Sequence, residues 1–118
     1  MRKVLLLLVG ALAIAPAPAL AGDGAKGARS QVEFGIAVAQ KNLWKEALYR
    51  WQKAVELDPG YAAAWNNLAI AWEHEGNFEE ARKAYDKALS LDPKNLFIKQ
   101  NYELFKEIND RANRKPAR

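Results

Sequence analysis

The stretch EALYRWQKAVELDP, residues 46–59, decides the fold of this chain because it occurs a second time in altered form. At an offset of 34 residues stands EARKAYDKALSLDP, residues 80–93, and seven of the fourteen aligned positions are identical. Both copies begin with Glu-Ala and end with Leu-Asp-Pro. A fixed period of this length predicts a stack of similar structural units.

The segments before these two stretches align at the same offset, ARSQVEFGIAVAQ (residues 28–40) with AAAWNNLAIAWEH (residues 62–74). In the second copy, large and small apolar residues recur at helical spacing, which places them on one face of a helix: Trp65, Leu68, Ala69 and Trp72. The next stretch repeats the pattern with Phe78, Ala81, Tyr85 and Ala88. Each unit is therefore predicted to contain two helical segments.

The predicted helix ends carry residues with special backbone preferences. Gly76 and Asn77 separate the two helices of the second unit, and glycine readily adopts the left-handed conformation that a helix end needs. Asn42 stands at the corresponding place in the first unit, and asparagine tolerates that conformation. Asp-Pro pairs at residues 58–59 and 92–93 end each unit, because proline disfavours helix in the residue before it.

A helix-turn-helix unit of 34 residues with W-x2-L, a later A-x3-[FYW]-x2-A and a terminal proline resembles the tetratricopeptide repeat. The resemblance covers residues 28–95. The departures are Gln31, where the family prefers tryptophan, and Ala69 and Asn42, where it prefers glycine. None of these departures removes a helix.

The resemblance implies an all-α fold of two tandem helix-turn-helix repeats and a C-terminal capping helix, a fragment of an α-solenoid. We divide the chain into a signal peptide (1–21), a flexible linker (22–27), a first repeat (28–61), a second repeat (62–95), a capping helix (96–113) and a basic tail (114–118). Ile98, Tyr102 and Phe105 give the last helix an apolar stripe, so we expect it to cap the stack.

The tryptophans occupy positions that packing explains. One repeat after Trp51 stands Tyr85, at a position where the family places an aromatic residue between neighbouring helices. The same comparison places Trp44 opposite Phe78 and Trp72 opposite Val38, and Trp65 opens the second unit. We therefore interpret all four tryptophans as core residues. Small residues stand where helices must approach closely, namely Gly35, Ala69, Ala47, Ala81, Ala54 and Ala88.

The first 21 residues have the organisation of a secretory signal peptide: a basic start (MRK), an apolar run over residues 4–15 and small residues (ALA) at 19–21. We expect cleavage after Ala21 and a periplasmic or secreted mature chain. The alternative is an uncleaved N-terminal membrane anchor, because residues 4–21 carry no charge. Pro16 and Pro18 argue against the anchor. Gly22 follows the cut and no cysteine is present, which excludes a lipid-anchored lipoprotein.

Composition limits the classes of function. The 118 residues suffice for one domain, and the absence of cysteine excludes a disulfide framework, a thiol nucleophile and a thiolate metal site. Without Arg2 and Lys3 the chain has 16 basic and 14 acidic residues, and four of the bases lie in RANRKPAR, residues 111–118. The body is near neutral, so we interpret the tail as a solvated terminus and predict no nucleic-acid partner.

The sequence contains no recognisable catalytic or metal-binding pattern. His74 lies between Glu73 and Glu75, but adjacent residues on a helix do not face the same point, so we interpret it as solvated or groove-lining. Glu79 and Glu80 fall in the first turn of a helix, where negative charge complements the helix dipole. H-E-x-x-H, a phosphate-binding loop and G-x-S-x-G are all absent, so we predict no enzyme activity, metal or cofactor.

In the tetratricopeptide family the first helices of successive repeats line a concave groove. The resemblance implies that the face of each first helix turned away from its packing stripe carries the binding residues. Ala63 and Glu107 lie on these faces together with fourteen candidates: Arg29, Val32, Glu33, Ile36, Gln40, Asn66, Asn67, Ile70, Glu73, His74, Phe97, Gln100, Asn101 and Leu104.

Ile36, Ile70 and Leu104 recur 34 residues apart in three successive first helices and would form a continuous apolar stripe flanked by amides. This pattern favours an apolar, weakly charged peptide segment as the partner. The alternative is that these side chains only fill the space between first helices. A family mode that clamps a peptide carboxylate with lysines, an arginine and asparagines is matched only by Asn67, so we do not expect an acidic-tail binder.

The predicted role is that of an exported adaptor or scaffold that mediates protein–protein interaction. The rival is a structural subunit that self-associates in an envelope assembly. Two repeats fall short of the three that usually bury a continuous core, which favours this rival. A monomer in light scattering would favour the adaptor, and an obligate dimer would favour the structural subunit.

Cleavage of residues 1–21 can be tested by mass. We predict that the exported protein begins at Gly22, because the apolar run is short and a small-residue site follows it. Intact-mass spectrometry of protein recovered from its native compartment measures this directly. A mass that includes Met1 would contradict the prediction and favour the membrane anchor.

Overall fold

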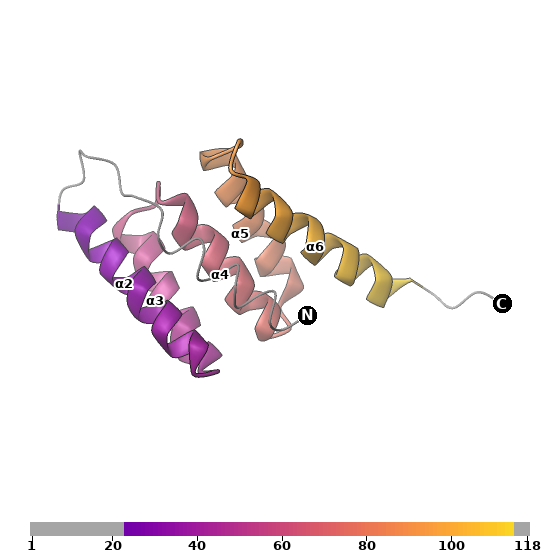
Figure 1. Ribbon diagram of the computed structural model, residues 1–118, viewed down its shortest axis with the longest axis horizontal. Helices are drawn as coiled ribbons and strands as arrows, with labels where there is room; N and C mark the ends of the chain where they lie inside the picture. Colours follow the sequence, from indigo (N-terminus) through magenta and orange to yellow (C-terminus); the bar gives the residue numbers. More distant parts are fainter. Residues whose placement is uncertain (1–22, 115–118) are drawn as a thin grey trace.

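A computed structural model describes residues 23–114, which form five helices. They are α2 (Asp23–Gln40), α3 (Trp44–Leu57), α4 (Ala62–His74), α5 (Phe78–Leu91) and α6 (Leu96–Asn113) (Figure 1). The protein has the predicted all-α fold of tandem helical repeats. The last helix has the predicted range of 96–113. The proposed signal peptide, Gly22 and most of the basic tail lie outside the described residues.

Short turns join consecutive helices into hairpins that stack side by side (Figure 1). α2 packs most extensively on α3, and α4 on α5. The two hairpins meet through α3 and α4, and α6 covers α5. Because α4 also contacts α2 and α6, the three first helices form one layer of the stack.

The flexible linker predicted at residues 22–27 is wrong where the structure describes it, because α2 already begins at Asp23. The glycines of this segment permit close helix packing. A Cβ atom on Gly24 would lie 2.8 Å from the carbonyl oxygen of Leu57, and one on Gly27 would lie 3.3 Å from the Leu57 Cδ1 atom. The first turns of α2 therefore lie directly against the end of α3.

The predicted turn residues adopt the expected backbone conformations. Asn42 has φ 66° and Gly76 has φ 77°, both in the left-handed region. Two of the helices are capped by asparagine side chains: Asn77 Oδ1 accepts a hydrogen bond from the Glu80 amide at 3.3 Å. Asn95 Oδ1 accepts one from the Ile98 amide at 3.1 Å. These caps satisfy backbone donors that a helix start leaves free.

Trp51 is a core residue, as the sequence predicts. It is 0% exposed, and its Nε1–H donates to the carbonyl oxygen of Val32 at 3.1 Å. Its ring lies across Gly35, where a Cβ atom would come within 2.3 Å of the Trp51 Nε1 atom. In the second repeat a smaller ring, Tyr85, and a larger residue, Ala69, occupy the positions equivalent to Trp51 and Gly35, and both are 0% exposed. The two repeats thus fill the same space with different pairs.

The other predicted core residues divide into two groups. Trp44 is buried, and Trp65 and Trp72 are partly buried against the core, as expected. Phe78 differs, because it is 47% exposed although Ala81 and Ala88 on the same face are fully buried. Its ring lies at the start of α5, with its centroid 6.3 Å from that of the Phe105 ring.

The Gly35–Trp51 contact yields a stability test. Gly35→Ala should lower the free energy of unfolding by about 1–3 kcal/mol, because overpacking outweighs the gain in helix propensity. Gly35→Ala combined with Trp51→Tyr reproduces the Ala69/Tyr85 pair, so the double variant should be more stable than the sum of the two single changes predicts. Urea denaturation followed by circular dichroism measures all three variants.

Gly60→Ala is the matched control, because the nearest atom to its added Cβ, Asp58 Oδ1, lies at an ordinary 3.5 Å. This control should change stability by less than about 0.5 kcal/mol. If the effects of the Gly35 and Trp51 changes on the free energy of unfolding were strictly additive, the two residues would not be coupled, and the proposed steric contact would be contradicted.

Candidate protein-interaction surface

The predicted groove residues all lie on α2, α4 and α6, but they differ in accessibility. The accessible or partly accessible ones are Arg29, Glu33, Gln40, Glu73, His74, Phe97, Gln100 and Leu104. The buried ones are Val32, Ile36, Asn66, Asn67, Ile70 and Asn101. Whether any of them binds a partner stays a prediction.

The apolar stripe predicted from Ile36, Ile70 and Leu104 is not open along its length. Ile70 has 0% exposure and Ile36 has 8%, whereas Leu104 is partly exposed. The physical reason is the central place of α4, which contacts both neighbouring first helices. Ile70 therefore fills space within the layer, which was the alternative interpretation, and Ile70→Asp is expected to unfold the chain rather than to report on binding.

Three buried amides form a row between α4 and α6. Asn66 Nδ2 donates to Asn67 Oδ1 at 3.4 Å, and Asn101 Nδ2 donates to Asn66 Oδ1 at 3.1 Å. All three residues are 0% exposed. Among the described residues, no group bonds the Asn67 Nδ2 or the Asn101 Oδ1 atom. The amide row therefore has a free donor at one end and a free acceptor at the other.

Glu73 is held between α4 and α5 by an interaction that the sequence pattern did not reveal. Its carboxyl accepts a hydrogen bond from the Tyr85 hydroxyl, twelve positions along the chain. Burial raises the pKa of Glu73 from 4.5 to about 7, and the hydrogen bond from Tyr85 opposes this rise only partly. Burial also raises the pKa of Tyr85 well above 10, and the charge of Glu73 adds to that shift.

The Tyr85 ring extends this contact to α6. It stacks on the ring of Tyr102 with centroids 5.1 Å apart and an interplanar angle of 13°. The Tyr102 hydroxyl donates to Asp86 Oδ1 at 2.8 Å. The aromatic identity of position 85 was predictable from the repeat, but its hydroxyl partner was not, because no spacing rule links Glu73 to it.

His74 lies in a packed contact, which differs from the solvated or groove-lining position expected. Its ring stacks on Trp44 with centroids 3.5 Å apart and an interplanar angle of 7°. It is only partly exposed. The stack joins the end of α4 to the start of α3, so His74 contributes to the contact between the two repeats.

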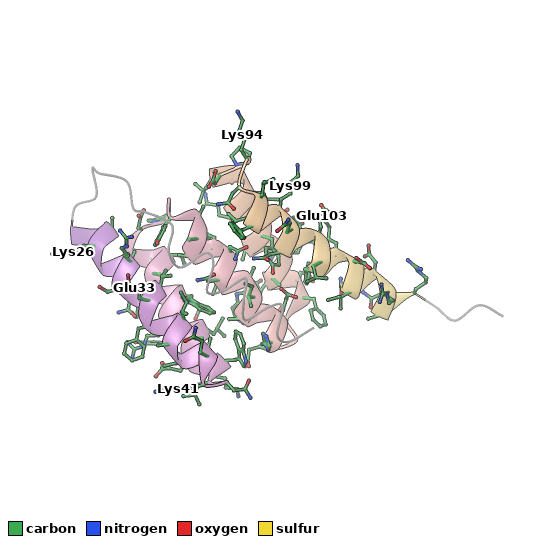
Figure 2. The ribbon with its side chains drawn as sticks, in the orientation of Figure 1. Lys26, Glu33, Lys41, Lys94, Lys99 and Glu103 are labelled. Atoms are coloured by element: carbon green, nitrogen blue, oxygen red, sulfur yellow. The ribbon has the colours of Figure 1, made fainter. Side chains whose placement is uncertain are left out.

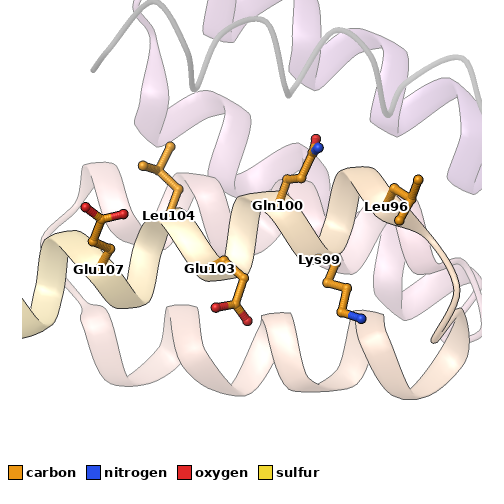
Figure 3. A pocket seen from close by; sticks show the side chains of 6 residues that line it. All are labelled: Leu96, Lys99, Gln100, Glu103, Leu104 and Glu107. Atoms are coloured by element: carbon orange, nitrogen blue, oxygen red, sulfur yellow. The ribbon is translucent and has the colours of Figure 1, made fainter.

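The exposed side of α6 borders a hollow of about 450 Å³ (Figure 3). Gln100 and Leu104, both predicted groove residues, line it together with Glu107. Leu96, Lys99 and Glu103 also line the hollow, and these three are not among the predicted groove residues. Figure 3 shows Leu96, Gln100 and Leu104 projecting along one edge of the helix and Lys99 and Glu103 along the other.

Residues 23–114 contain neither a cluster of metal-ligating side chains nor a helix suited to span a membrane. In this part of the chain, no three histidine or carboxylate side chains are grouped so that they could hold a metal ion. Over the same residues, no helix combines the length and the apolar character that crossing a bilayer requires.

A stack of short helix hairpins whose first helices present amides and apolar side chains defines a helical-repeat interaction module. Comparison with known families agrees: a tetratricopeptide repeat model matches residues 62–95, and a second TPR repeat model matches residues 35–73. The chain belongs to the tetratricopeptide repeat family. Repeats of this family are protein–protein interaction modules, and this chain carries two of them.

Relatives of diverse origin share the repeat region. A chloroplast tetratricopeptide repeat domain-containing protein of Arabidopsis thaliana is 28% identical over 86 residues, 73% of this chain and 29% of the relative. An uncharacterized protein of Methanocaldococcus jannaschii is 34% identical over 70 residues, 59% of this chain and 81% of the relative. A DnaJ homolog subfamily C member 7 homolog of Dictyostelium discoideum is 33% identical over 79 residues, 67% of this chain and 15% of the relative. The chain thus spans less than a third of the first and the last of these relatives.

The environment of Glu73 predicts a pH-dependent stability. Between pH 4.5 and about 7 the folded chain keeps a proton that the unfolded chain has released. The stability that Glu73 contributes is therefore fully present below pH 4.5 and is lost as the pH rises through about 7. Glu73→Gln keeps an acceptor for Tyr85 without a titrating group, so its stability should fall less than that of the natural chain over this range.

Urea midpoints measured by tryptophan fluorescence in steps from pH 4.5 to 7.5 test this difference, with the exposed Glu79→Gln as the control. The control should keep the pH profile of the natural chain. Parallel profiles for the natural chain and Glu73→Gln would show that Glu73 does not release its proton differently in the folded and unfolded states.

Proposed function

We propose that this chain is an exported adaptor that holds a segment of another protein along the layer formed by α2, α4 and α6. The single observation that carries the proposal is the amide row of Asn66, Asn67 and Asn101, whose two ends have no hydrogen-bond partner among the described residues. The family membership supports it, since tetratricopeptide repeats are interaction modules.

The free ends of the amide row match the groups of a peptide backbone. Asn67 Nδ2 can donate to a backbone carbonyl, and Asn101 Oδ1 can accept from a backbone N–H. A buried polar atom without a partner is unfavourable, and a bound segment would supply both missing partners. Main-chain recognition of this kind does not depend on the partner's side chains, so the specificity must come from the surrounding surface.

That surface favours an apolar, weakly charged segment. Phe97 is 49% exposed and Leu104 is partly exposed, and Gln100 lies between them on α6. Across the layer, Arg29 and Glu33 on α2 form an ion pair at 3.8 Å, so this rim is locally neutral. A strongly charged segment would find little compensation here, whereas apolar side chains could cover Phe97 and Leu104.

Binding at the amide row requires a shift of α6, because the three asparagines have no exposed surface. α6 is the helix most able to move. Its buried side chains, Ile98, Asn101, Tyr102 and Phe105, all lie in its first ten residues, and its remaining turns are exposed or partly exposed. We therefore expect partner binding to be coupled to a displacement of α6 from α4.

A structural, self-associating role is the second candidate, and one observation favours it. Phe34 is 48% exposed, whereas Leu68 at the same position of the next repeat is 5% exposed. The guanidinium of Arg50 lies over the Phe34 ring, 4.1 Å from the centroid. This end of the stack could pack against another copy. An obligate dimer in light scattering would support this role.

The adaptor is tested by placing a charge on the exposed side of α6. Leu104→Asp should weaken partner binding at least about tenfold, because the interface would have to desolvate an unpaired carboxylate. Leu104 is only partly exposed but is not packed against the core, so the variant should keep its helicity. Crosslinking in cells that make the chain from its own locus, followed by mass spectrometry, identifies and compares the partners.

Tyr49→Asp is the control, because Tyr49 is 49% exposed on the second helix of its repeat, outside the proposed surface. It should leave the crosslinked partner unchanged. Loss of the partner in both variants, or in neither, would contradict binding on the first-helix layer.

A further inference from the structure

The start of α6, just after the turn from α5, carries the most exposed large apolar side chain of the described residues, Leu96 at 68%. Phe97 beside it is 49% exposed, and Leu91 before the turn is 36% exposed. Two exposed lysines, Lys94 and Lys99, flank the pair. We call Lys94, Leu96, Phe97 and Lys99 the basic corner; Figure 2 shows its two lysines projecting at one end of the stack.

The two lysines of the basic corner are not held in ion pairs within the described part of the chain. Neither Lys94 nor Lys99 takes part in any of the six ion pairs between residues 23 and 114. The carboxylates nearest in sequence form other contacts: Asp92 Oδ2 accepts a hydrogen bond from Asn95 Nδ2 at 3.0 Å, and Glu103 pairs with Lys106 at 3.0 Å. The corner therefore combines exposed apolar surface with two exposed lysines that form no ion pair with the described residues.

A second segment of the chain serves as a control for the basic corner, because the sequence Lys-Asn-Leu followed by an aromatic residue occurs twice. Residues 41–44 (KNLW) and Lys45 cover the turn between α2 and α3 and the start of α3, at the opposite end of the stack from Lys94 (Figure 2). Leu43 there is 52% exposed, and both lysines are exposed. Trp44, however, is only 8% exposed, because its ring stacks on His74. The two corners match in charge but differ in exposed aromatic surface.

We propose that the basic corner docks on an anionic lipid bilayer, with Leu96 and Phe97 at the boundary between headgroups and acyl chains. Apolar side chains that protrude at the start of a helix can insert into a flat surface. The flanking lysines complement lipid phosphates, which selects an anionic leaflet over a neutral one. Two apolar side chains and two cations give weak, reversible and salt-sensitive binding, not a stable anchor.

Site-specific labelling tests the orientation on the bilayer. The chain has no cysteine, so Leu96→Cys and Leu43→Cys each provide one labelling site for the environment-sensitive fluorophore NBD. With vesicles of equal parts phosphatidylglycerol and phosphatidylcholine, emission from position 96 of the full chain should rise and shift to the blue. Position 43 should not respond, and phosphatidylcholine alone should produce no change at either position.

Charge-matched variants test the lysines. Lys94→Gln combined with Lys99→Gln should lower the partition constant on the anionic vesicles roughly tenfold or more, since each lysine near the surface contributes about fivefold. Lys41→Gln combined with Lys45→Gln removes the same charge and should lower it far less. All four lysines are exposed, so circular dichroism should show unchanged helicity.

The outcomes separate this proposal from the adaptor function, since the variants change only Lys94, Leu96 and Lys99, which are not groove candidates, and leave the shared Phe97 in place. An equal response of the two corners would mean unspecific attraction of a basic chain, and it would overturn the proposal. No emission change at position 96 would also overturn it, as would capture of an acidic protein by this corner without any response to vesicles.

Discussion

The contact between Trp51 and Gly35 is the constraint on which the rest of the stack depends. The indole can reach the carbonyl oxygen of Val32 only because position 35 has no Cβ atom, and this brings α3 against the backbone of α2. Trp51 is then fully buried, and its ring lies 6.5 Å from that of Trp44. Trp44 in turn carries the stacked ring of His74 from the next repeat. The absence of a side chain at Gly35 thus sets the distance between α2 and α3, and α4 in turn packs on α3.

Much of the fold could be predicted from the sequence because the two copies of the repeat can be aligned with each other. Helix existence, the left-handed turns at Asn42 and Gly76, and the burial of Trp51 all follow from periodicity and residue type. The helical start of α2 could not be predicted, because glycines that permit close packing and glycines that permit flexibility look alike in a sequence. The candidate site was predicted less well: a helix face can be assigned from spacing, but the burial of Ile70 depends on how closely neighbouring first helices lie.

The two ends of the stack are closed differently. At one end, the exposed Phe34 ring has the Arg50 guanidinium over it, and Arg50 is held by Glu46 at 3.5 Å. At the other end, Glu103 stands at the position of Gly35 and Ala69, where a small residue admits the second helix of a repeat. An exposed carboxylate paired with Lys106 cannot admit a helix at that distance. α6 therefore lacks the small residue that admits the second helix in each of the two repeats.

Polar contacts give α4 a unique place in this small core. Apolar packing alone tolerates sliding of one helix along another, because many registers bury similar area. Asn66 bonds to Asn101 on α6, the Glu73 carboxyl accepts from Tyr85 on α5, and His74 stacks on Trp44 of α3. α3, α5 and α6 are therefore each fixed relative to α4 by a directional interaction. The same arrangement links function to stability: a segment that displaces Asn101 from Asn66 removes one of these three restraints. Partner binding would then loosen α6 first, while the contacts of Glu73 and His74 keep the two hairpins together.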